Sequence, residues 1–242
     1  MTEEVKTPRT PEEVAAFVKR AEASTEKLQA EAAKARAEAR KAEAEALEAE
    51  CDAQTARIVS DKAIEEETRR KAGDRFHHRY VFDGQVTGAS VEKCIAELTT
   101  WHRLGPSCDI TIVFNSPGGE VISGMNLFDH IRYLRAKGHH ITTVCMGYAA
   151  SMAGILMQAG DKRVMGRESY LLIHEVSFMA AGSMGDVEDT VEWVKKVQER
   201  VLDIFAERST MSRASIKKKW TRKDWWLSST EALKAGFVDE IA

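Results

Sequence analysis

The hydrophobic pattern divides the 242-residue chain into two parts that meet near residue 75. From Pro11 to Ala72, alanine and charged residues predominate, and these are mostly good helix formers. Beyond that point, short apolar runs alternate with stretches of helical spacing. We therefore expect a charged, alanine-rich helical segment over residues 1–75 and a folded domain over residues 76–242.

The first part carries signals for both ends of one long helix. Thr10-Pro11-Glu12-Glu13 favours a helix start, because threonine is a good N-cap, proline suits the first turn and acids face the positive helix end. Gly73 suits the C-terminal cap. A helix of this length extends about 90 Å at about 1.5 Å per residue, which suits a stalk, a spacer or a docking arm.

Uncharged residues recur along this helix at alternating intervals of four and three, the 3.5-residue repeat of a coiled coil. The seam comprises Val14, Val18, Ala21, Thr25, Leu28, Ala32, Ala35, Ala39, Ala42, Ala46, Ala49, Ala53 and Ala56. Alanine buries little area, so each layer would contribute weakly. A coiled coil or bundle and a lone helix held by Glu–Lys and Glu–Arg pairs both remain open.

The second part alternates strands and helices. Apolar runs predict strands at 79–82, 109–114, 141–146, 163–165 and 170–173. Helical spacing predicts helices at 89–102, 121–136, 151–159, 187–208 and from about 229. The inner side of the 121–136 helix is expected to carry Ile122, Met125, Phe128, Ile131 and Leu134. Strands separated by helices indicate βαβ units with right-handed crossovers and therefore an α/β fold. Arg135–His140 is expected to lie in a loop.

The composition of the chain serves mainly to exclude classes of protein. The net charge is -3, so nothing marks the chain as a nucleic-acid binder. No apolar run reaches the roughly 18–20 residues that span a bilayer, and the polar stretch from Met1 to Pro11 lacks a signal-peptide core. We expect a soluble, cytoplasmic protein without a membrane partner. The scattered cysteines indicate buried or incidental thiols and no metal site: Cys51, Cys94, Cys108 and Cys145.

Three stretches lie at the ends of predicted strands, where α/β proteins place their sites. Asn115-Ser116-Pro117-Gly118-Gly119 predicts a tight turn whose backbone N–H groups could face a cleft and bind an oxyanion, although such runs are commonly plain turns. In the second, Gly147 to Gly154, small residues surround Ser151 at a strand-to-helix turn. That serine is either a nucleophile, with the Met152 N–H beside it, or a plain helix cap.

The third stretch ends an apolar strand with His174. It is either a general base or a structural histidine, whereas the other six histidines are interpreted as surface or linker residues. A serine nucleophile needs a base, and the base needs an orienting acid. Acids after His174 are plentiful, so spacing alone cannot select one. Asp224 is one candidate, and a solvated charge beside Lys223 is its alternative role.

Taken together, these stretches resemble the ClpP family of serine peptidases, within the ClpP/crotonase fold group of repeated ββα units. The resemblance runs from about Tyr80 to the C-terminus. Phe114 to Gly119 is similar to the family's oxyanion turn, and Cys145 to Ala153 to its nucleophile turn. Ile173-His174 is similar to the segment of its catalytic histidine, and Lys223 to Ile241 resembles its C-terminal segment, with Asp224 in the acid position.

The resemblance implies a catalytic triad of Ser151, His174 and Asp224 and an oxyanion hole formed by the N–H groups of Gly119 and Met152. It implies that the substrates are polypeptides and that no cofactor is needed. It also implies heptameric rings, stacked in pairs around a chamber. Residues 182–184 and the helix after them resemble the family's handle, which joins the rings.

Two departures from the family affect these expectations. A long charged helix occupies the end where family members form an axial pore and contact an unfoldase ATPase, so that docking is in doubt. Glu175-Val176 replaces the more usual glutamine-proline after the histidine. A ClpP-like domain joined to such a helix suits a phage prohead (head maturation) protease in the host cytoplasm, with a capsid or scaffold protein as its partner.

Two other classes remain as alternatives. A catalytically decayed assembly or scaffolding protein would explain the long helix, but not the intact set of site residues. A crotonase-type acyl-CoA enzyme shares the two-amide oxyanion device, but it needs no serine nucleophile.

Overall fold

A computed structural model describes residues 10–105 and 107–242, and the chain divides into two compact units, residues 1–69 and 70–242. The polar stretch used above to argue against a signal peptide lies mostly outside the described residues. Among the helices that the structure does describe, none is long and apolar enough to cross a membrane.

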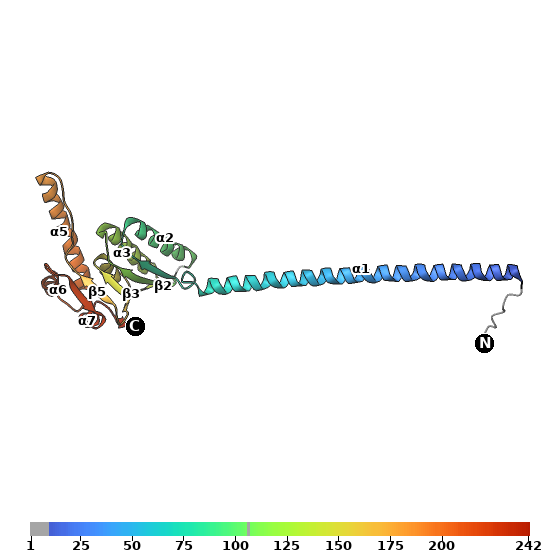
Figure 1. The fold of residues 1–242 in the computed structure, drawn as a ribbon. Helices are drawn as coiled ribbons and strands as arrows, with labels where there is room; N and C mark the ends of the chain where they lie inside the picture. Colours follow the sequence, from blue (N-terminus) through green and yellow to red (C-terminus); the bar gives the residue numbers. More distant parts are fainter. Residues whose placement is uncertain (1–9, 106) are drawn as a thin grey trace. The chain divides into compact units, whose positions relative to one another are not determined.

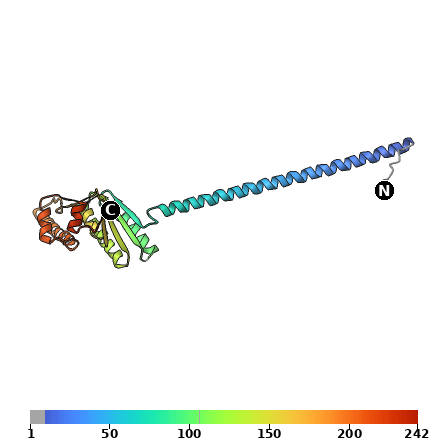
Figure 2. The ribbon, with the colours of Figure 1, turned by 90° about the horizontal axis from the view of Figure 1, so that it is seen from below.

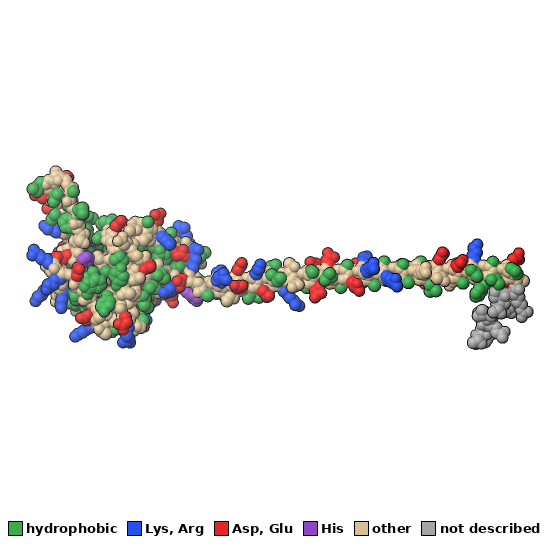
Figure 3. All heavy atoms as spheres, in the orientation of Figure 1, with side chains coloured by type: hydrophobic (Ala, Val, Ile, Leu, Met, Phe, Trp, Pro, Cys, Tyr) green, Lys and Arg blue, Asp and Glu red, His purple; other side chains and the backbone are tan. Residues whose placement is uncertain are grey.

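Helix α1 spans Pro11–Ala72, as the sequence predicts (Figure 1). At its start, the Glu13 N–H donates to Thr10 Oγ1 at 3.2 Å, and the Thr10 N–H donates to Glu13 Oε2 at 3.1 Å. None of its residues is buried. Acidic and basic side chains alternate along it, with ion pairs such as Lys34–Glu38 and Lys41–Glu45 (Figure 3). The helix is confirmed, while the pairing of its seam with another helix stays a prediction.

Within the described residues, seven strands form one sheet in the order β1-β2-β3-β4-β7, and β5 joins β3 to β6. The strands are β1 (Arg79–Asp83), β2 (Asp109–Ser116), β3 (His140–Ala150), β4 (Lys162–Met165), β5 (Tyr170–Ile173), β6 (Trp225–Ser228) and β7 (Glu240–Ile241). The β5–β6 pair is antiparallel and the other pairings are parallel. The predicted α/β fold is confirmed, although β6 and β7 were not foreseen.

Helices share the main core with one face of the sheet (Figures 1 and 2). They are α2 (Gly88–Leu104), α3 (Val121–Ala136), α4 (Met152–Met157), α5 (Met184–Glu207), α6 (Arg213–Trp220) and α7 (Ser229–Ala235). The largest fully buried side chains include Trp101, Phe114, Phe205 and Trp220. These come from α2, β2, α5 and α6, so one core holds the whole domain together.

A bend in β3 positions the candidate site. The first half of β3 pairs with β4 through Thr142–Cys145, and the last residues pair with β5 through Tyr148–Ala150. Between them, Gly147 has φ 84°, and a Cβ there would lie 2.6 Å from Asn115 Oδ1. Only glycine fits this position, because it tolerates positive φ and has no Cβ. The bend brings the end of β3 beside β5, which in turn pairs with β6.

The structure corrects three expectations about individual residues. Ile122 is 59% exposed rather than on the inner side of α3. Helix α3 extends to Ala136 and β3 begins at His140, so the expected loop at 135–140 shrinks to residues 137–139. His139 is buried rather than on the surface. Its ring Nε2 lies 2.8 Å from His102 Nδ1, and its Nδ1 lies 3.1 Å from the Cys108 carbonyl oxygen.

Candidate active site

Ser151 lies at the turn between β3 and α4 in a strained conformation, with φ 55° and ψ -122°. A non-glycine residue rarely adopts positive φ, and such strain is concentrated at functional sites. The Ser151 N–H donates to the Leu172 carbonyl of β5 at 3.0 Å, which fixes the turn against that strand. The Ser151 side chain forms no cap for α4, so the alternative role as a helix cap is not supported.

His174 follows directly after β5, and its Nε2 lies 2.7 Å from Ser151 Oγ. This distance suits proton transfer from the hydroxyl to the ring. Nε2 is the acceptor when the neutral ring carries its proton on Nδ1, the tautomer that a carboxylate beside Nδ1 favours. The structure thus brings together two residues that are 23 positions apart in the sequence.

Asp224 directly precedes β6. In the antiparallel β5–β6 ladder the last pair is Ile173 with Trp225, so His174 and Asp224 face each other one step further along. Asp224 Oδ1 lies 3.5 Å from His174 Nδ1, and the Asp224 side chain is 66% exposed. In a competent site these two atoms are expected to lie about 3 Å apart. Asp224 therefore lies on the Nδ1 side of the His174 ring, at the distance of an ion pair rather than that of a short hydrogen bond.

Gly118 and Gly119 form the turn after β2 that faces Ser151. The Val86 N–H donates to the Gly118 carbonyl, and the Glu120 N–H donates to the Val86 carbonyl, each at 2.8 Å. These two bonds anchor the turn on both sides of Gly119. A Cβ on Gly118 would lie 2.7 Å from Ser151 Cβ and 2.9 Å from the Met152 nitrogen. The close approach of the two backbone segments therefore requires glycine at that position.

A cavity contains the predicted serine, histidine and oxyanion residues together. It is lined by Gly119, Val121, Ser151, Met152, Ile155, Ile173, His174, Glu175, Val176, Ser177, Val201 and Phe205. Its apolar lining comes from α3, α4, β5, α5 and the segment after β5. A substrate segment here would be partly shielded from water, which strengthens interactions with backbone dipoles.

The cysteines supply no competing nucleophile to this cavity. Cys145 in β3 is buried, and burial raises the pKa of its thiol to about 12 although Ser169 hydrogen-bonds to it. Burial likewise raises the pKa of the Cys94 thiol. Within residues 10–105 and 107–242, no group of three or more His, Cys, Asp or Glu side chains is arranged to hold a metal ion.

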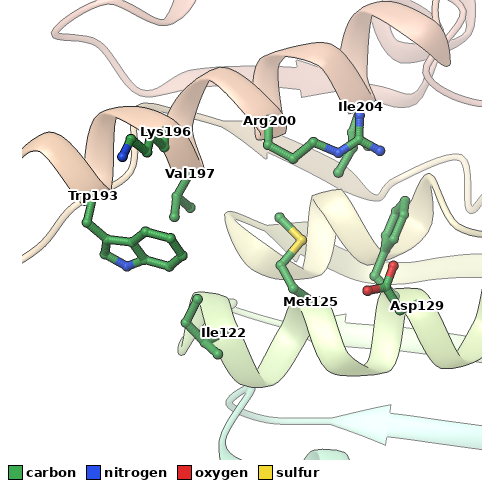
Figure 4. A pocket seen from close by; sticks show the side chains of 9 residues that line it. Ile122, Met125, Asp129, Trp193, Lys196, Val197, Arg200 and Ile204 are labelled. Carbon is green, nitrogen blue, oxygen red and sulfur yellow. The ribbon is translucent and has the colours of Figure 1, made fainter.

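A second, apolar groove lies between α3 and α5, with a volume of about 370 Å³. Ile122 and Trp193 stand at one end of it, and Asp129 stands at the other (Figure 4). Because the groove is open here, Ile122 and Trp193 are both more than half exposed. This opening explains why the helical spacing of α3 misplaced Ile122.

One residue of the site, Glu175, was not predicted from the sequence as a site residue. Glu175 lines the cavity, and its Oε2 accepts a hydrogen bond from the Arg222 backbone N–H at 2.7 Å. A signal was present, since Glu175 was recognised as a departure after the histidine, but its partner is 47 residues away.

Comparison with known proteins identifies a family for this chain. A model of the Clp protease family matches residues 66–242. The chain is similar to the "ATP-dependent Clp protease proteolytic subunit" of Deinococcus radiodurans, with 31% identity over 166 residues, covering 67% of this chain and 79% of that protein. It is also similar to the "ATP-dependent Clp protease proteolytic subunit 1" of Rhodococcus jostii, with 34% identity over 171 residues, covering 69% and 76% of the two chains.

Proposed function

Because the chain belongs to the Clp protease family, we propose that it cleaves polypeptides with Ser151 as nucleophile, His174 as general base and Asp224 as orienting acid. The expectation of a ClpP-family serine peptidase is confirmed by that membership. Membership of this family also argues against a crotonase-type acyl-CoA enzyme.

In the proposed reaction, Ser151 Oγ attacks the carbonyl carbon of a peptide bond while His174 Nε2 takes the hydroxyl proton. Asp224 stabilises the resulting imidazolium through Nδ1. His174 then gives its proton to the leaving amine, which leaves an acyl-enzyme on Ser151. A water molecule, deprotonated by the same nitrogen, hydrolyses that ester and restores the hydroxyl.

The proposed oxyanion hole consists of the backbone N–H groups of Gly119 and Met152. Support comes from their position in the cavity wall beside Ser151 and from the anchoring of the Gly118–Gly119 turn by Val86. Preorganised backbone donors stabilise the charge that develops in the tetrahedral intermediate without reorganising at that moment.

The observation that carries this proposal is the 2.7 Å distance between Ser151 Oγ and His174 Nε2. It is tested with a fluorophosphonate probe and a fluorogenic peptide on the full-length protein. Ser151→Ala should lose both labelling and hydrolysis, whereas Ser177→Ala, at another serine in the cavity lining, should keep both. Equal labelling of Ser151→Ala and the unmodified protein contradicts the assignment. Labelling without any hydrolysis by the assembled particle would favour the decayed scaffolding alternative.

We further propose that the chain assembles into heptameric rings that stack through α5. The outer part of α5 and the segment before it carry exposed apolar side chains, among them Met179 at 94%, Met184 at 76% and Trp193 at 54% (Figure 3). Apolar patches of this kind mark protein–protein contacts. Sedimentation of the full-length protein should give a particle of seven or fourteen subunits, and a monomer at micromolar concentration contradicts this.

The partner of the assembled peptidase is proposed from α1. Relatives are named as ATP-dependent, so an unfoldase ATPase is one candidate. The long charged helix supports instead a phage prohead protease in the host cytoplasm, in which α1 delivers the peptidase into an assembling capsid. Co-expression with capsid and scaffold proteins tests this: the unmodified protein should co-assemble and cleave, and Ser151→Ala should co-assemble without cleavage. Failure to co-assemble contradicts the role.

A further inference from the structure

Glu175 connects the two chain segments that carry His174 and Asp224. Its Oε2 accepts the hydrogen bond from the Arg222 backbone N–H at 2.7 Å. Glu175 follows His174 directly, and Arg222 comes two residues before Asp224. The side chain therefore ties the end of β5 to the turn that leads into β6.

This tie occurs where the sheet itself no longer holds the chain. The β5–β6 ladder ends at Ile173 and Trp225, so Asp224 lies just beyond the last strand pair. The turn before it closes with a bond from the Lys223 N–H to the Trp220 carbonyl at 3.0 Å. Within that turn Arg222 has φ 54°, a conformation that costs a non-glycine residue free energy and persists only when surrounding contacts hold it.

Asp224 has little packing of its own to fix it, because its side chain is 66% exposed and lies 3.5 Å from His174. Its position thus depends on the backbone that carries it. A hydrogen bond to a charged acceptor is among the stronger contacts available to such a turn. We propose that Glu175 is a positioning residue of the peptidase, whose carboxylate holds the Arg222 N–H and thereby keeps Asp224 opposite His174. This inference rests on the proposed function.

A different role for Glu175 would be substrate selection, since it also lines the cavity. A carboxylate that selects basic side chains acts through its charge and changes KM. A carboxylate that positions Asp224 acts through one oxygen at the correct reach and changes kcat. The two roles therefore predict different rankings of variants.

Two conservative substitutions distinguish the effect of the length of the Glu175 side chain from the effect of its charge. Glu175→Gln keeps an acceptor oxygen at the same distance but loses the charge, and Glu175→Asp keeps the charge but shortens the side chain by one carbon. In the full-length assembled protein, we expect Glu175→Gln to retain kcat within about threefold, because a neutral carbonyl still accepts the N–H. Glu175→Asp and Glu175→Ala should lower kcat about tenfold with KM little changed, the size expected when an orienting group loosens.

The double variant supplies a readout that a merely structural role would not move. In an Asp224→Asn background, Glu175→Ala should have little further effect on kcat, since both changes act on the same contact. Glu168→Ala, which removes an exposed acid before β5, serves as the control and should match the unmodified protein.

Several results would overturn the inference. They are Glu175→Asp as active as Glu175→Gln or more so, a change confined to KM, and full additivity of Glu175→Ala with Asp224→Asn. If Glu175→Ala does not assemble, the Gln and Asp variants alone decide. If hydrolysis does not need Ser151, the proposed function fails. If it needs Ser151 while all Glu175 variants behave as the unmodified protein, only the positioning role fails.

Discussion

His174 and Asp224 face each other one step beyond the last pair of the β5–β6 ladder, with Nδ1 and Oδ1 3.5 Å apart. The antiparallel register places these two residues, and the side chains add a loose electrostatic contact. The proposed acid is therefore positioned by strand pairing more than by its own hydrogen bonds.

Asp224→Asn tests this contact. The amide cannot stabilise an imidazolium as a carboxylate does, and it can favour the wrong ring tautomer. We expect kcat for peptide hydrolysis to fall about 100-fold or more, with Ser151 still reachable by a small serine probe. Steady-state kinetics and the rate of probe labelling measure the two effects. An unchanged kcat would exclude Asp224 as the acid and leave another carboxylate to be found.

Gly118→Ala tests the close approach of the glycine turn to the serine turn. The added Cβ would lie 2.5 Å from the Ala150 carbonyl oxygen and 2.7 Å from Ser151 Cβ, so the two segments must separate. A displacement near 1 Å at a reacting group costs about 100-fold in rate, and we expect a loss of at least that size in kcat. Gly84→Ala is the matched control, because Gly84 has a similar φ of +91° and its Cβ would meet nothing within 4 Å. If both variants lose activity equally, backbone strain rather than the clash is responsible.

The seam of α1 is tested by two pairs of Ala→Gln substitutions in the full-length protein. Ala39 and Ala46 lie on the seam, whereas Ala37 and Ala44 lie on the opposite side of the helix. Glutamine is a good helix former, so neither pair should unfold a lone helix. In a coiled coil the seam pair blocks close approach, and we expect its thermal midpoint by circular dichroism and its self-association to fall clearly below those of the other pair. Identical behaviour of the two pairs would assign α1 as a lone helix.

Asp239 links β7 to β4 through a buried arginine and makes stability depend on pH. Burial raises the pKa of the Asp239 carboxyl, but the hydrogen bonds and charge of Arg163, with the charge of Arg208, outweigh it and lower the pKa below its usual 3.8. A lowered folded pKa means that this stabilisation is present above about pH 4 and is lost as the pH falls through the folded value.

Asp239→Asn should therefore destabilise the domain at pH 7 and reduce the loss of stability in acid. We expect about 1–3 kcal/mol at pH 7, less than for a fully buried pair because the Asp239 side chain is 41% exposed. Urea unfolding at pH 7 and at pH 3 measures both effects at one protein concentration. The exposed Lys162–Glu240 pair offers a control, since Glu240→Gln should cost less than about 0.5 kcal/mol. An equal effect of both variants would show that the burial of Arg163 is unimportant.

Elements with strong local patterns were predictable from the sequence. Helix α3 has the predicted bounds, Val121–Ala136, and β5 spans the predicted Tyr170–Ile173. Both have apolar spacing that matches their period and clear breaks at their ends. Strand β6 has only four residues, and its burial depends on its pairing with β5, so the sequence signalled it weakly.

The candidate site was predictable only in part from local sequence. Ser151 and His174 follow apolar strands, and this position made them candidates on physical grounds. Asp224 needed the family resemblance, because many acids follow His174 and only the register of two strands distinguishes one of them. Glu175 and the buried His139 depend on partners far along the chain, which no local pattern reveals.

The register of β6 against β5 also has a consequence for how the chain can vary in length. A slip by one residue would put Lys223 or Trp225 opposite His174 and turn alternate side chains to the other face of the sheet. Neither a cation nor an indole can balance a protonated imidazole. Connecting segments normally tolerate insertions and deletions, but those close to β6 should abolish peptidase activity. A single residue gained or lost there can shift the register while the domain still folds.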